Sequence, residues 1–181
     1  MELVYALLII LIIACLLAIV YVFYYNKLQE AKLKVNEAES IIDENLRKKY
    51  DTIIDIKNLI DNTIKNNKIN FKDLNNLKEL NLSNFDLDRK LDEYMNLINT
   101  VSEDHKKIND SKEMDEFLSE IKRIDEKITS AKSFYNNYIT ESNLLAKKFP
   151  SNIIARIHGI NVKPFFDNKN MEDEDINDFK L

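Results

Sequence analysis

Glycine and proline, on which most tight turns depend, are scarce in this sequence. Its 181 residues include 1 Gly and 2 Pro. Few turns can be built from so little of either, so we predict one domain made of a small number of long helices. One glycine cannot supply a glycine-rich phosphate-binding loop. The one cysteine, Cys15, excludes an intramolecular disulfide.

Histidine is scarce as well, and this argues against metal chemistry. His105 and His158 are the only two, and neither has a cysteine or carboxylate at the spacing of a metal-ligand set. No nucleophile elbow is present in the sequence. We therefore predict that the protein is not an enzyme, with no catalytic residues, no metal, no cofactor and no small-molecule substrate.

What the sequence does contain is one long apolar run, residues 3–25, "LVYALLIILIIACLLAIVYVFYY", without a charged residue. As a helix it is about 35 Å long, enough for the roughly 30 Å hydrocarbon core of a bilayer. Tyr5 lies near one end and Tyr21, Tyr24 and Tyr25 near the other, where aromatic rings favour the headgroup boundary. We predict a single-pass transmembrane helix over residues 1–25, so the membrane is one partner.

Two other interpretations of this run are weaker. A cleaved signal peptide has a basic start and a shorter apolar stretch, and neither is found here. The letters "IIAC" resemble a lipobox, but the apolar run continues for ten residues past Cys15. We therefore expect the helix to be retained and Cys15 to be an ordinary buried thiol.

The basic residues beside the run predict its orientation in the cell (plasma) membrane. None precedes it, whereas Lys27, Lys32 and Lys34 follow. The positive-inside rule therefore places the N-terminus outside and the C-terminal domain in the cytoplasm. Residues 167–181 carry a net charge of −4 and are expected to form an acidic disordered tail, while residues 26–166 balance, which argues against a nucleic-acid partner.

Beyond the apolar run, the spacing of apolar residues predicts an all-α fold. Steps of three and four indicate an amphipathic helix up to about residue 66, with turns at residues 65–71 and 104–110. Ser83 or Asn84 is expected to cap a middle helix, and Asp110 with Glu113 fits a capping box before the last one. The predicted stripe of the first helix is Leu28, Ala31, Val35, Ala38, Ile42, Leu46, Tyr50, Ile53, Ile56, Ile60 and Ile64.

The last long helix has the most regular pattern, a heptad seam that ends before Pro150. Such a narrow stripe needs partner helices, so we predict that residues 26–149 form a long antiparallel up-and-down bundle or coiled-coil hairpin of three to four helices. Residues 150–166 are expected to form a short C-terminal helix or flap, capped by Ser151 and ended by Gly159. The seam consists of Phe117, Ile121, Ile124, Ile128, Ala131, Tyr135, Tyr138, Ser142, Leu145 and Phe149.

Two regions, one near the middle of the first long helix and one towards the C-terminus, resemble the LemA family of bacterial single-pass membrane proteins. "LRKKYDTIIDIKNLI", residues 46–60, resembles that family's paired bases, Tyr-Asp and following apolar residues, although Asp55 stands where the family commonly has proline. "AKSFYNNYITESN" and "KFPSNIIARIHGINVKPFFD", residues 131–143 and 148–167, are similar to its C-terminal motifs. The resemblance implies a membrane-anchored antiparallel helical bundle and supplies no catalytic activity. The function that we expect is a non-enzymatic scaffold with unknown protein partners. The alternative is a self-associating, homo-oligomeric protein that organises membranes.

Two candidate interaction sites follow. In the first, Arg47, Lys48 and Lys49 precede Tyr50 and Asp51; they either form a recognition patch or a solvated helix face that is neutralised by nearby acids. In the second, residues 153–166 either pack over the end of the bundle or form a basic amphipathic element that docks on a protein or membrane. The residues of this second site are Arg156, His158, Lys163, Phe165 and Phe166.

Overall fold

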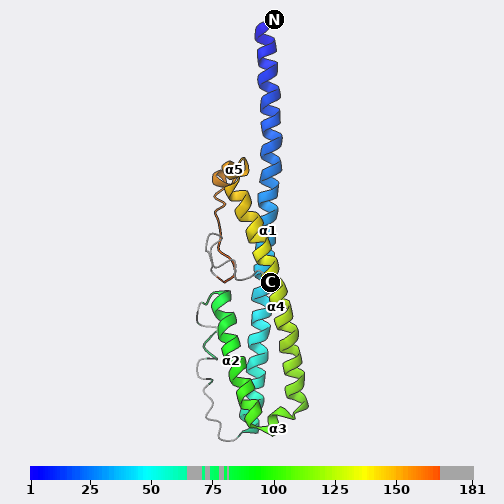
Figure 1. Cartoon of the computed structure of the whole chain (residues 1–181), viewed down its shortest axis with the longest axis vertical. Coiled ribbons are helices and arrows are strands. Elements are labelled where there is room, and N and C mark those ends of the chain that lie inside the picture. The colour runs from blue at the N-terminus through cyan, green and yellow to red at the C-terminus, as the bar shows by residue number, and fades with distance from the viewer. Residues whose placement is uncertain (65–70, 72–73, 78–79, 81, 168–181) are drawn as a thin grey trace. The chain divides into compact units, whose positions relative to one another are not determined.

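The computed structural model describes residues 1–64, 71, 74–77, 80 and 82–167 (Figure 1). None of these residues forms a strand, so the predicted all-α class is confirmed. The predicted turn at residues 65–71 and the predicted tail at 167–181 lie almost wholly outside the described residues. The helices are α1 (Glu2–Thr63), α2 (Asn84–Asp104), α3 (Lys106–Asn109), α4 (Lys112–Lys147) and α5 (Ser151–Ile157).

The helices divide into two compact units. The first consists of Met1–Glu37 and the described part of Phe134–Leu181. In this unit α4 is antiparallel to α1, because Lys34 lies over the ring of Tyr138, with Nζ 5.1 Å from the centroid, while Leu145, further along α4, packs near Leu28, earlier in α1.

The second unit, Ala38–Ser133, contains three helical segments. Lys49 of α1 pairs with Asp92 of α2 and Asp125 of α4, and Asp88 of α2 pairs with Lys132 of α4. These pairs make α2 antiparallel to α4. The helix α2 is parallel to α1: Asn84, at the start of α2, lines a pocket with Asp43 of α1, and Asp92, further along α2, pairs with Lys49, further along α1. The predicted antiparallel arrangement therefore does not hold for these two helices. The up-and-down order therefore joins α2 to α4 through α3, as Figure 1 shows, whereas α1 and α2 are joined by a longer connection.

The helix ends follow from local hydrogen bonds. Ser83 caps α2, as predicted, because its Oγ accepts from the backbone N–H of Asp86 at 3.1 Å. The capping residue predicted for α4 was wrong by one position: Ser111, and not Asp110, accepts from the N–H of Met114 at 3.4 Å. Ser151 does not cap α5 either, since its hydroxyl donates backwards to the carbonyl of Lys148.

The glycine at the end of α5 does what the sequence predicts. Gly159 has a φ of 63°, a left-handed conformation that costs glycine little. The N–H of Ile160 donates to the carbonyl of Ala155 at 2.8 Å, and the N–H of Gly159 donates to Arg156. These two bonds form a Schellman motif, which satisfies carbonyls that the short helix would otherwise leave without partners.

The apolar stripe predicted for α1 is buried from Leu28 to Ile60 without an exception, and only Ile64 is half-buried. On α4 the predicted seam is buried from Ile121 to Ala131. Beyond it, Ile139 is buried in place of Tyr138, which is half-buried. Phe149 departs furthest from the prediction, with 80% of its surface exposed, because α4 ends at Lys147 and the chain turns away.

The start of α1 differs from the rest of that helix. Every residue from Glu2 to Phe23 is exposed, although the run holds no charge after Glu2. Among the described helices, α1 alone is long and apolar enough to cross a membrane. The helix continues from this run to Thr63 without a break, as expected from the absence of glycine and proline.

Candidate interaction site

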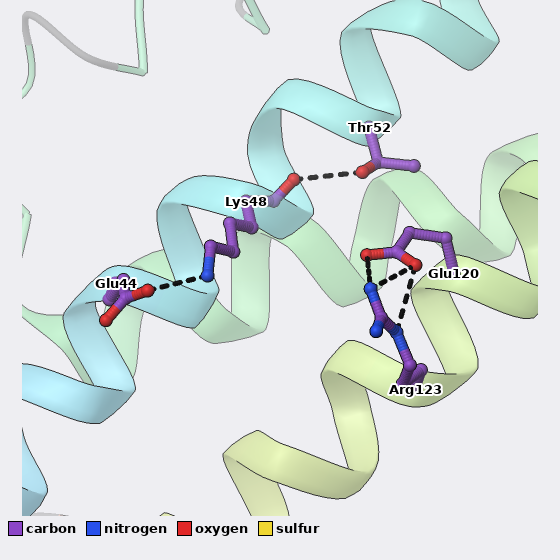
Figure 2. A network of polar contacts seen from close by, with 5 residues as sticks. All are labelled: Glu44, Lys48, Thr52, Glu120 and Arg123. Carbon is purple, nitrogen blue, oxygen red and sulfur yellow. Dashed lines mark hydrogen bonds and ion pairs between the residues drawn. The ribbon is translucent and has the colours of Figure 1, made fainter.

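The three bases that the sequence singles out do not act together. Arg47 donates to Asp43 at 2.9 Å and Lys48 donates to Glu44 at 2.6 Å, both along the same helix. Figure 2 shows Lys48 beside Glu44, and a similar pair on α4, where Arg123 donates to Glu120. These pairs are exposed to solvent, so each contributes little to stability.

The same pairs set the electrostatics of this face. The hydrogen bond and the charge of Lys48 hold the pKa of Glu44 below its ordinary value, and Asp43 holds the pKa of Arg47 above its own. Glu44 and Arg47 therefore stay charged near neutral pH. For Arg47 and Lys48, the solvated-face interpretation describes the geometry.

Lys49 behaves differently from its two neighbours. Only 2% of its side chain is exposed, and its Nζ lies 2.6 Å from an oxygen of Asp92 and 2.6 Å from an oxygen of Asp125. One ammonium group thus joins three helical segments of the second unit. Asn45, one turn earlier, is also buried and donates to the carbonyl of Ile41. We call Lys49, Asp92 and Asp125 the Lys49 triad.

The charge state of Lys49 results from two opposing effects. Burial disfavours the ammonium form, but hydrogen bonds to Asp125 and Asp92 outweigh it, so the pKa of Lys49 lies above its ordinary value of 10.5. Both sequence interpretations placed Lys49 at the surface, and both were wrong for this residue. Tyr50 is buried too, which leaves Arg47, Lys48 and Asp51 as the exposed members of the predicted site.

A groove lies between α2 and α4 beside the Lys49 triad. Leu118, Ile121 and Met95 provide its apolar wall, and Asp92, Asp125 and Glu126 line it with carboxylates. The two triad carboxylates are 58% and 44% exposed, so they face this groove while one oxygen of each contacts Lys49. Sequence reasoning missed the groove because its two sides come from helices whose pairing no local pattern reveals.

A signal for the burial of Lys49 exists in the sequence. Ile42 and Ile56 lie seven residues before and after Lys49, and both are in the buried stripe. A seven-residue step returns to nearly the same face of a helix. Lys49 is therefore on the core side of α1, which the adjacent bases obscure.

Part of the second candidate site is hydrogen-bonded to other residues of the first unit. The amide of Asn143 bonds to the backbone of Lys163 in both directions, at 2.8 and 3.0 Å, and Asn136 accepts from the N–H of Phe166. Nε2 of His158 lies 2.7 Å from the hydroxyl oxygen of Tyr21. Residues 158–166 are thus hydrogen-bonded to α1 and α4. Phe165 and Phe166 are half-buried, and Arg156 is exposed.

Within the described residues, no group of three or more His, Cys, Asp or Glu side chains could hold a metal ion. Among protein-family models, the model of the LemA family matches residues 38–177 of the chain. The chain belongs to the LemA family. In this LemA-family chain the match covers most of the helical body and begins after the apolar run. Searches of curated proteins and of solved structures found no match.

Proposed function

We propose that this LemA-family chain is a membrane-anchored, non-enzymatic scaffold that presents its helical body to other proteins at the cytoplasmic face of the cell membrane. One observation carries the proposal: residues 3–23 of α1 are exposed although none of them is charged, whereas the stripe from Leu28 to Ile60 is buried. An uncharged helical surface of that length is unfavourable in water and favourable in hydrocarbon.

The role of the polar groups supports a scaffold in preference to an enzyme. Lys49, the most buried charged group among the described residues, pairs with two carboxylates on two other helices. Asp88 and Lys132 form a second ion pair between α2 and α4. These ion pairs between helices stabilise the helical body. The remaining charged pairs lie on a solvated surface, to which a partner can bind.

Photo-cross-linking in cells, followed by purification of the full chain, tests the scaffold. We expect the wild type to capture one or more specific proteins. Two variants then locate the contact: Arg47→Ala with Lys48→Ala alters the exposed bases, and Asn99→Arg with Thr129→Arg fills the groove between α2 and α4. All four positions are exposed, so helicity should be unchanged in both variants. Absence of any specific protein partner in the wild type would overturn the scaffold.

Burial of the α4 seam within one chain favours the scaffold over self-assembly. Ile124 and Ile128 are buried in the second unit, so another copy of the chain could reach them only if the unit opened. We expect the full chain in detergent to sediment as a monomer. Concentration-dependent oligomers would instead support the membrane-organising alternative.

The proposed orientation has a direct test. Ser133 is exposed on α4, so a Ser133→Cys variant that also carries Cys15→Ser offers a single accessible thiol. We expect an impermeant thiol reagent to label it only after the cells are opened. Labelling in intact cells would place the helical body outside.

A further inference from the structure

The short helix α5 packs against the part of α1 next to its fully exposed apolar run. Leu28 of α1 forms a buried cluster with Ile154 and Ala155 of α5. Four residues earlier, Tyr24 is half-buried against this cluster. The ring of His158 lies 4.7 Å from that of Tyr25, and its Nε2 is 2.7 Å from the hydroxyl oxygen of Tyr21. Figure 1 shows α5 at the end of α4, with α1 continuing past it.

The position of α5 on α1 fixes its depth relative to the proposed membrane. At 1.5 Å per residue, about 20 residues span the roughly 30 Å hydrocarbon core, and residues 3–22 supply that length. The polar headgroup layer adds about 5 to 7 Å on each side, or about three to five helical residues. That layer therefore covers approximately residues 23–27. Because α5 and His158 contact α1 between Tyr21 and Leu28, α5 lies at the depth of the headgroups.

The face of α5 that points away from its buried cluster is apolar and exposed. Ile153 and Ile157, four residues apart, are 52% and 66% exposed. Phe149, just before the helix, is 80% exposed. Side chains of this kind at the edge of a bilayer gain by entering the boundary between headgroups and acyl chains.

The segment that carries these apolar side chains has acidic or basic residues of one sign only. Residues 142–166 contain no Asp or Glu. Lys148 and Arg156 are exposed and lie close to Phe149 and Ile157 in the sequence. The four bases of this stretch are Lys147, Lys148, Arg156 and Lys163. Basic side chains beside exposed apolar ones match an anionic lipid surface, to which each base near the surface adds attraction.

We propose that α5 is a membrane-surface contact: Phe149, Ile153 and Ile157 insert into the headgroup layer of an anionic bilayer, and Lys148 and Arg156 contact its lipid phosphates. This inference rests on the proposed membrane anchor, because the depth of α5 is counted from the exposed apolar residues 3–22 of α1. A bilayer is favoured over a protein as the occupant because α5 is fastened to α1 at headgroup depth. The contact would fix the tilt and rotation of α1 in the membrane.

Fluorescence quenching in vesicles tests the proposal with the full-length chain. Three proteins carry one labelled thiol each: the native Cys15, and two Cys15→Ser variants with either Ile157→Cys or Asn137→Cys. Both new positions are exposed, so labelling should not disturb packing. Asn137 is the control, because it lies on α4 about 15 Å along the helix from its end. Vesicles of phosphatidylcholine, with and without phosphatidylglycerol, carry nitroxide lipids with the quencher near the headgroup or deep in the chains.

We expect deep nitroxides to quench Cys15, shallow ones to quench the probe at residue 157, and neither to quench the probe at residue 137. The loss of emission at residue 157 should be larger with phosphatidylglycerol. Quenching of Cys15 without quenching at residue 157 would overturn the contact and leave the anchor intact. No quenching of Cys15 would overturn the anchor itself. Equal loss with and without phosphatidylglycerol would overturn the attraction of the bases to an anionic bilayer.

Discussion

Two stretches of α1 are both rich in apolar residues, yet they are covered in different ways. From Leu3 to Phe23 the apolar side chains surround the helix and all of them are exposed. From Leu28 to Ile60 most of them form one stripe, and every residue of the stripe is buried. A helix that is apolar all round needs an apolar solvent, whereas a stripe needs neighbouring helices. The arrangement of apolar residues, and not their number, therefore indicates what covers each stretch.

The largest expected effect comes from placing charges in the first stretch. Ile12→Arg with Leu16→Arg puts two cations near the proposed bilayer centre, where the two together cost roughly 5 to 7 kcal/mol of insertion free energy. We expect much of this variant to be extracted from membranes by alkaline carbonate. The control, Glu37→Arg with Ile41→Arg, places the same pair on exposed positions of the covered stretch and should remain in the membrane. Equal retention of both variants would contradict the anchor.

Removing apolar volume should have the opposite pattern: it should destabilise the covered stretch and have little effect on the exposed one. Leu46 is fully buried, so Leu46→Ala should lower the free energy of unfolding by about 2 to 5 kcal/mol, through lost burial and the cavity that remains. Leu8 is half-exposed, so Leu8→Ala should change it by less than about 0.5 kcal/mol. Urea unfolding of the full chain in detergent, followed by circular dichroism, measures both. Similar losses for the two variants would mean that the first stretch is also covered by protein.

Much of this contrast could be predicted from local patterns, and the parts that could not be predicted have two causes. The stripe of α1, the cap at Ser83 and the turn at Gly159 depend on residues near one another in the sequence. The partners of Lys49 do not: Asp92 is 43 residues away, on a helix whose direction no local pattern specifies. Phe149 was assigned to the seam because heptad counting continues until a breaker, whereas α4 ends two residues before it.

Lys49 interrupts the apolar character of the covered stretch, and its replacement measures what the Lys49 triad contributes. Lys49→Ala removes the shared cation and the packed stem, which should cost about 1 to 3 kcal/mol. That is less than for a wholly buried ion pair, because Asp92 and Asp125 remain partly solvated. Lys49→Met keeps the stem and should cost less than the alanine variant. Lys48→Met, at an exposed position on the same turn, is the control and should leave the unfolding midpoint nearly unchanged.

The pH dependence of the same variants separates charge from packing. The pKa of Lys49 is raised in the folded protein, so its contribution is fully present below about pH 10.5 and is lost as the pH rises through the folded value. The difference in unfolding free energy between wild type and Lys49→Met should therefore shrink above about pH 10.5. A difference that stays constant at alkaline pH would mean that Lys49 contributes through packing alone.

The smallest effect concerns the boundary between the two stretches, where α5 covers Leu28. Gly159 ends α5 with a φ of 63°, and a Cβ built there meets no atom within 4 Å. Gly159→Ala should therefore cost about 1 kcal/mol through backbone strain and not through a clash. Gly159→Asn should cost less, because asparagine tolerates the left-handed conformation. If strain weakens the Schellman motif, α5 should dissociate more often from Leu28, and hydrogen exchange should quicken at the N–H of Ile160 before it does in α2 or α4. Unchanged exchange at Ile160 in the alanine variant would show that α5 is held to α1 by its cluster with Leu28 and does not need its glycine.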